Sequence, residues 1–140
     1  MKQQQIGEFI RVRAKDQRAD GSFVRYSVPA GGQFGAGAKT YTTTFATSLL
    51  VGALSGAGDR QLTRVRERAV DWLLEQRGSE WSFNYWGRKT KEAKVQPYPD
   101  DWDDTSCAVA ALTLARPKAV TGEVLGHMIT LLTNTEMDEG

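Results

Sequence analysis

The chain has 140 residues, of which 40% are hydrophobic and 25% are charged, and its net charge is +1. This size suits one domain or part of one, and the near-neutral charge gives no reason to expect nucleic acid as a partner. The single cysteine, Cys107, excludes an internal disulfide framework and favours a reducing compartment. No apolar segment has signal-peptide character or approaches the roughly 20 residues that span a bilayer. We therefore expect a cytoplasmic protein with at most peripheral membrane contact.

Helical periodicity predicts five helices. In chain order they lie around residues 6–10, 43–54, 61–78, 103–115 and 121–135. The first, third and fifth are amphipathic; Leu62, Ala69 and Leu73 lie on the apolar face of the third. The second and fourth are apolar nearly all round, which predicts helices buried by their neighbours. No segment alternates with a period of two, so we expect no sheet.

The two apolar segments are related by an internal repeat. TSLLVGAL (47–54) matches TSCAVAAL (105–112) at five of eight positions, 58 residues apart, and an upstream turn repeats with Phe23 paired to Trp81. A fixed period carried by both helix and turn is typical of stacked helical hairpins. The sequence therefore predicts an all-α array of hairpins. The predicted units are a first repeat at about 3–57, a second at about 60–116 and an extra outer helix at about 121–135.

Four acids precede the second apolar helix, within PYPDDWDDTS: Asp100, Asp101, Asp103 and Asp104. The first repeat builds its apolar helix without acids at the corresponding positions, so the fold does not require them. Helix capping would account for one or two acids and contributes about 1 kcal/mol. A third and a fourth repel the others, which indicates a candidate functional site.

The turns that join the predicted helices carry a Gln-x-x-x-Gly-x-aromatic pattern, represented by Gln17, Gly21 and Phe23. Together with the alternation of apolar and amphipathic helices, they resemble the QW turns of the α/α-toroid in squalene–hopene cyclases and class II diterpene cyclases, which carry the prenyltransferase and squalene oxidase repeat. The second turn, with Gln76 and Gly78, departs from the usual spacing of that motif. The stretch DWDDT is similar to the DxDD signature of the same family.

The resemblance implies that Asp103 donates a proton to an alkene or epoxide of an isoprenoid, flanked by Asp101 and Asp104, and starts a cyclisation that needs no cofactor. Burial and neighbouring carboxylates raise a carboxyl pKa, as such an acid requires. Aromatic faces can stabilise a cation, although they can equally well pack between repeats. The candidate substrate-binding aromatics are Trp81, Phe83, Tyr85, Trp86 and Trp102. Arg88 and Lys89 are candidates for binding a substrate diphosphate. The alternative interpretation is that both side chains are solvated in a polar loop.

The acids also fit two metal-site patterns. DDxxD, with Asp100, Asp101 and Asp104, coordinates Mg²⁺ in class I prenyl synthases, but here two prolines place the motif at a loop–helix junction. A zinc site of the protein prenyltransferase kind would draw on Asp104, Cys107 and His127, at a spacing that differs from that family. In the cyclase interpretation we expect no metal.

A closed ring of this type takes about six hairpins, or roughly 350 residues at this period. We therefore expect the chain either to be part of a longer polypeptide or to complete its ring as a homo-oligomer. The alternative function is a non-catalytic, toroid-like module that binds an isoprenoid or a protein partner.

Overall fold

The computed structural model describes residues 3–27 and 38–138. The molecule is mostly helical, as predicted, with 59% helix and a small two-stranded sheet. In chain order its elements are α1 (Gln3–Ala14), β1 (Val24–Ser27), β2 (Lys39–Thr42), α2 (Thr44–Leu54), α3 (Arg60–Gln76), α4 (Lys91–Val95), α5 (Trp102–Ala115), the 3₁₀ helix η1 (Pro117–Ala119) and α6 (Gly122–Asp138). All five expected helices are present. Within these ranges, no helix combines the length and apolarity needed to cross a bilayer.

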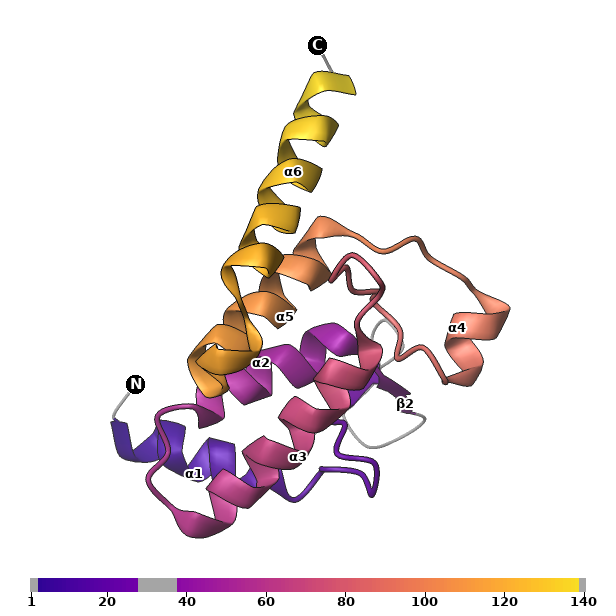
Figure 1. Cartoon of the computed structure of the whole chain (residues 1–140). Coiled ribbons are helices and arrows are strands. Elements are labelled where there is room, and N and C mark those ends of the chain that lie inside the picture. Colours follow the sequence, from indigo (N-terminus) through magenta and orange to yellow (C-terminus); the bar gives the residue numbers. More distant parts are fainter. Residues whose placement is uncertain (1–2, 28–37, 139–140) are drawn as a thin grey trace.

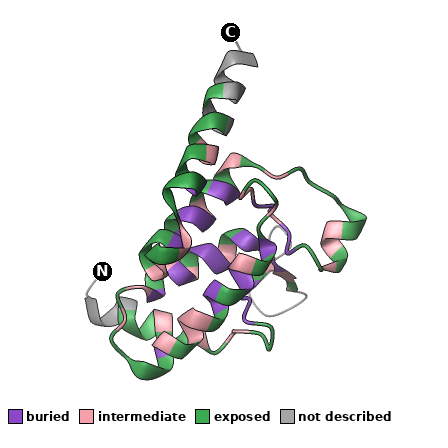
Figure 2. Ribbon diagram, viewed as in Figure 1, coloured by how far each residue is buried: buried purple, intermediate pink, exposed green. Residues whose placement is uncertain are grey.

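The helices α2 and α5 lie side by side and run in the same direction, and α3 packs against them in the opposite direction (Figure 1). Buried residues gather where these three helices meet (Figure 2). Phe23, Leu54, Leu73, Phe83 and Leu112 are among the fully buried side chains. The helix α1 covers one end of this core, and the C-terminal half of α6 projects away from it (Figure 1). The core therefore depends on residues from both predicted repeats.

A short antiparallel hairpin precedes α2. Val24 of β1 pairs with Thr42 of β2, and Ser27 pairs with Lys39. The prediction of no sheet is wrong, because strands of four residues are too short for a period of two to become visible. The hairpin leads directly into α2 and so helps to fix where that helix begins.

The repeat is visible in the hydrogen bonds of its turns. The amide of Phe23 donates to Thr47 Oγ1 at 3.1 Å, and the amide of Phe83 donates to Thr105 Oγ1 at 3.0 Å. Each bond joins a buried turn aromatic to the first turns of α2 or α5. The two turns therefore hold their helices in the same way.

These contacts correct the register of the turns. Gly21 has a φ of 97° and Trp81 has a φ of 60°, and their amides donate to the carbonyls of Arg18 and Gly78 respectively. Trp81 is thus the counterpart of Gly21, and Phe83 is the counterpart of Phe23. The predicted pairing of Phe23 with Trp81 is wrong, since the turns repeat at 60 residues while the helices repeat at 58.

The prediction that α2 and α5 are buried by their neighbours is wrong for part of each helix surface, and one exposed side is shared by both helices. Phe45 and Leu49 of α2 are 38% and 53% exposed, and Leu114 of α5 is 65% exposed. Asp103 occupies the position in α5 that corresponds to Phe45 in α2 and is also exposed. We call Phe45, Leu49, Asp103 and Leu114 the open stripe. It is largely apolar and carries one of the four acids.

Candidate functional site

Asp101 begins α5 as its N-cap. Its side chain accepts a hydrogen bond from the Asp104 amide at 2.8 Å, and its own amide donates to the carbonyl of Phe83 at 3.2 Å. Thr43 has the same role in the first repeat, where it accepts from the amide of Ala46 at 3.2 Å. Capping therefore explains Asp101, and a threonine would have sufficed for it.

Asp100 is held by a different set of partners. Its carboxylate accepts from Ser82 Oγ at 2.5 Å and from the Arg88 guanidinium at 2.7 Å. Burial opposes its ionisation, but the hydrogen bonds from Ser82 and Arg88 and the charge of Arg88 outweigh burial and lower the pKa of Asp100. Asp100 therefore ties the loop before α4 to the start of α5.

Asp104 is the buried member of the cluster, with 2% of its surface exposed. Burial raises its pKa to about 7, with further contributions from the charge and hydrogen bond of Asp101 and from the charges of Asp103 and Asp100. Its Oδ1 atom has no hydrogen-bond partner among the described residues. The site thus holds a carboxyl group whose pKa lies near neutral pH, so that about half of the molecules retain its proton at pH 7.

Asp103 lies on the open stripe, about 100° around the helix from Asp104. Cys107 lies one turn further along α5 and is half-buried; burial and the charges of Asp104 and Asp103 raise the pKa of its thiol. Three carboxyls within one turn therefore have three environments, with Asp101 capping, Asp103 open to solvent and Asp104 buried.

The aromatic candidates do not converge on one cavity. Phe83 is fully buried in the core, and Trp81 lies in its turn with the Arg77 guanidinium 5.0 Å from its ring centroid. Trp102, the first residue of α5, is half-buried. These positions favour packing over substrate binding for Phe83 and Trp81.

Tyr85 and Trp86 do line a pocket, of about 510 Å³, whose wall includes Asp101. Trp86 stacks on Tyr98 at 6.0 Å between ring centroids and lies 5.8 Å from the ring of Tyr41. Sequence reasoning missed Tyr41 and Tyr98. A lone tyrosine in a short strand and one between two prolines give no periodic signal that could have identified them.

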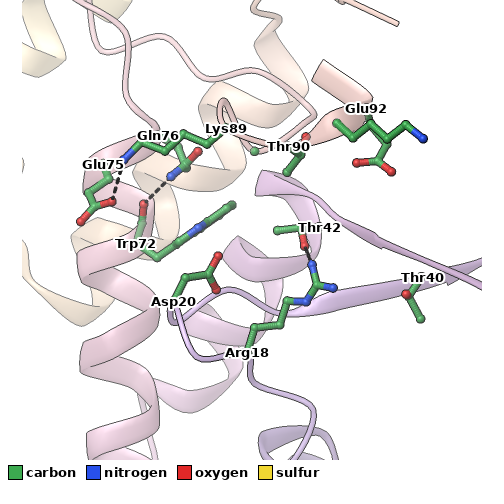
Figure 3. Close-up of a pocket in the computed structure, with 12 residues that line it drawn as sticks. Arg18, Asp20, Thr40, Thr42, Trp72, Glu75, Gln76, Lys89, Thr90 and Glu92 are labelled. Atoms are coloured by element: carbon green, nitrogen blue, oxygen red, sulfur yellow. Dashed lines mark hydrogen bonds and ion pairs between the residues drawn. The ribbon is translucent and has the colours of Figure 1, made fainter. Parts of the chain in front are cut away.

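The structure does not bring Arg88 and Lys89 together. Arg88 is occupied by Asp100 and also donates to the Gln76 carbonyl at 2.5 Å, whereas Lys89 is 88% exposed and lies 3.8 Å from Glu75. Lys89 borders a separate hollow of about 450 Å³ with Trp72 and charged groups of both signs (Figure 3). The two side chains therefore do not form one anion-binding pair.

The acids are not arranged as a metal site either. Over the described ranges, no three histidine, cysteine or acidic side chains are grouped so that they could hold an ion. Asp100, needed for the DDxxD pattern, is paired with Arg88, and His127, needed for a zinc site, lies 3.8 Å from Glu80.

Comparison with known proteins adds no relative. The chain matches no protein-family model, no curated protein and no solved structure. The likeness to toroid cyclases therefore stays a resemblance of repeat and motif, and the chemistry of the described residues is the basis for proposing a function.

Proposed function

We propose that the chain forms part of a class II terpene-cyclase-like site in which a carboxylic acid of the Asp101–Asp104 cluster protonates an isoprenoid. The observation that carries this proposal is the buried Asp104 carboxyl, whose pKa is raised to about 7. Alkene protonation requires an un-ionised acid at the working pH, which an aspartate with an ordinary pKa does not provide. The helical repeats support an incomplete α/α-toroid of about two and a half hairpins.

A proton donor needs access to the substrate and a retained proton, and Asp103 and Asp104 each have one of these two properties. Asp103 has the position, because it lies on the open stripe where a substrate can reach it, and it is the donor that the DxDD resemblance implies. Asp104 retains its proton to a higher pH, because burial and the neighbouring Asp101 raise its pKa. In either case an O–H bond of the acid breaks, a C–H bond forms on the alkene, and a carbocation and a carboxylate result.

The surroundings favour a neutral isoprenoid over a diphosphate. The open stripe presents Phe45, Leu49 and Leu114, and exposed apolar side chains of this size suit a hydrocarbon chain. Arg88, which forms an ion pair with an acid of the cluster, is neutralised by Asp100. We therefore propose squalene-like or terpenoid-tailed substrates in preference to a prenyl diphosphate.

The second candidate is a module that binds an isoprenoid or a protein without catalysis. It is favoured by the exposure of the open stripe, since protonation of an alkene requires a site from which water is excluded. Catalysis thus requires something to cover this stripe, whereas binding does not.

The test is an assay of the purified chain with squalene and with geranylgeranyl diphosphate, read by gas chromatography and mass spectrometry. We expect a cyclic product from the hydrocarbon, lost by about 100-fold or more when the true donor, Asp103 or Asp104, is changed to Asn. Asp71→Asn, at an exposed position on α3, is the matched control and should keep full activity. Tryptophan fluorescence that reports binding without product would favour the non-catalytic module. If the chain gives no product and shows no binding of either isoprenoid, the cyclase proposal and the isoprenoid-binding module are both contradicted, and only a module that binds a protein partner remains.

A further inference from the structure

The burial of α2 and α5 can be compared position by position, because each residue of α2 has a counterpart 58 residues later in α5. Three core-facing positions are buried in both helices, with Thr47, Val51 and Leu54 matching Thr105, Val109 and Leu112. The open stripe is uncovered in both. The two remaining sides of each helix differ, and that difference is informative.

One side is covered in α2 and uncovered in α5. In α2 it consists of positions that are buried or half-buried: Thr44, Ser48, Gly52 and Ser55. In α5 the counterparts are Trp102, which is half-buried, and Ser106, Ala110 and Thr113, which are exposed. The spacing of four, four and three residues places each set along one side of its helix. We call this the downstream side.

The opposite side shows the reverse pattern. In α5, Asp104, Ala108 and Ala111 are buried. Their counterparts in α2 are Ala46 and Leu50, which are half-buried, and Ala53, which is exposed. We call this the upstream side.

These patterns indicate one contact that is present between α2 and α5, and two repeat-equivalent surfaces that are more exposed. The most extensive contact between described helices joins α2 to α5. The downstream side of α2 and the upstream side of α5 are each more buried than their repeat counterparts, so we assign this contact to those two sides. The downstream side of α5 and the upstream side of α2 are repeat-equivalent to those two surfaces, yet each is less buried than its counterpart, with Ser106, Ala110 and Thr113 exposed on α5 and Ala53 exposed on α2. Each of these sides has small residues at the same positions as a surface that the chain already packs against its own repeat, except that Trp102 replaces Thr44 and Leu50 replaces Ala108.

We infer that a second copy of this chain docks head-to-tail, with the upstream side of its α2 against the downstream side of α5. Alanine, serine and threonine at the contact allow close helix approach, as they do between α2 and α5 of one chain. Ala53 also borders a groove of about 760 Å³, whose lining includes Ile10, Ala57 and Leu62 together with the charged Glu8, Arg11 and Asp59. Such a contact is heterologous, so it extends to a ring or to a chain of copies.

The acid site is incomplete without this second copy. Asp103 lies next to the downstream side of α5, and α2 of the same chain flanks only the other side of that helix. The docked α2 would place Ala46 and Leu50 of the second copy against the downstream side of α5, next to Asp103, and reduce the exposure of Asp103 to water. The inference itself rests on burial alone and does not depend on the acid chemistry.

The test uses two exposed alanines, one on each uncovered side: Ala53→Glu on α2 and Ala110→Glu on α5. Molar mass is measured by light scattering after gel filtration over a concentration series, and circular dichroism checks that each variant is folded. We expect the wild-type chain to exceed the mass of one chain and each single variant to be a monomer. An equimolar mixture of the two variants should give a dimer of twice the single-chain mass, because the intact α5 side of one meets the intact α2 side of the other.

The control is Ala19→Glu, which makes the same change at an exposed turn position and should keep the wild-type mass. A wild-type chain that stays monomeric at every concentration would overturn the proposal and leave the α5 side to a different occupant. Single variants with the wild-type mass, or a mixture that remains monomeric, would also overturn it, because the contact would not be the head-to-tail one.

Discussion

Two aspartates at the start of α5 have pKa values displaced in opposite directions. Both are removed from water to some degree, but Asp100 has Ser82 and Arg88 as partners, whereas Asp104 faces other carboxyls. A cation and hydrogen-bond donors stabilise the charged form, and like charges and burial destabilise it. The partners of each side chain, more than its place in the motif, therefore decide which acid holds a proton.

Asp104 should make folding less favourable as pH rises. The pKa of its carboxyl is 3.8 in the unfolded chain and about 7 in the folded chain. Below the lower value both states are protonated, and the stabilisation is fully present. Between the two values the fold retains a proton that the unfolded chain has released, so the free energy of unfolding falls with pH and levels off above the upper value. The displacement corresponds to at most about 4 kcal/mol, since neighbouring carboxyls share the titration.

Urea unfolding at about pH 5 and about pH 8 measures this effect. We expect the wild-type chain to be less stable at the higher pH by on the order of 1–3 kcal/mol. Asp104→Asn should remove most of that difference, because the amide is neutral at both values. Asp71→Asn should leave it unchanged. Equal pH dependence in the wild type and in Asp104→Asn would show that another group causes it.

The sequence indicates that acids are present in excess of what capping needs, but it does not say which of them is buried. Asp103 and Asp104 are adjacent in the chain and lie about 100° apart around α5, so a small change in helix phase exchanges their environments. The phase is set by the cap at Asp101 and by packing on α2, and both become visible only in the folded chain. The family resemblance names Asp103, and the burial of Asp104 could not be predicted from the motif.

At the scale of elements, the two threonines that accept from turn amides should contribute equally. Thr47→Val or Thr105→Val keeps the shape of the side chain but leaves the buried amide of Phe23 or Phe83 without its acceptor. Each substitution should lower the free energy of unfolding by about 1–3 kcal/mol. Thr130→Val, at an exposed position on α6, should change it by less than about 0.5 kcal/mol. A large effect at one threonine and none at the other would mean that the two turns are not equivalent.

The elements show where sequence patterns are informative and where they fail. The helix α3 is predicted well because its charged and apolar faces are separated over 17 residues. The turn register was misassigned because the connection from Phe23 to Thr47 spans 24 residues and that from Phe83 to Thr105 spans 22. Trp81 lies two residues before Phe83, so matching aromatic residues at the helix period selects the wrong partner.

For the molecule as a whole, the apolar character of α2 and α5 predicts burial on every side of these helices. An apolar composition predicts that a helix surface is buried, but it does not say whether the same chain or another molecule buries it. Among the described residues, the core-facing side of both helices and one further side of each are the most buried, whereas the remaining sides are partly or fully exposed. The mostly helical fold can be predicted from the sequence repeat, but the number of repeats that pack against each repeat cannot.

The proposed acid site requires a carboxyl that retains a proton near neutral pH in the intact molecule. Titration of the aspartate side chains, followed by the chemical shift of their carboxyl carbons, measures it directly. We predict one carboxyl that titrates near about pH 7 and whose signal is absent from Asp104→Asn. If every aspartate instead titrates below about pH 5, no group in the cluster retains a proton at neutral pH and the proposed acid site is contradicted.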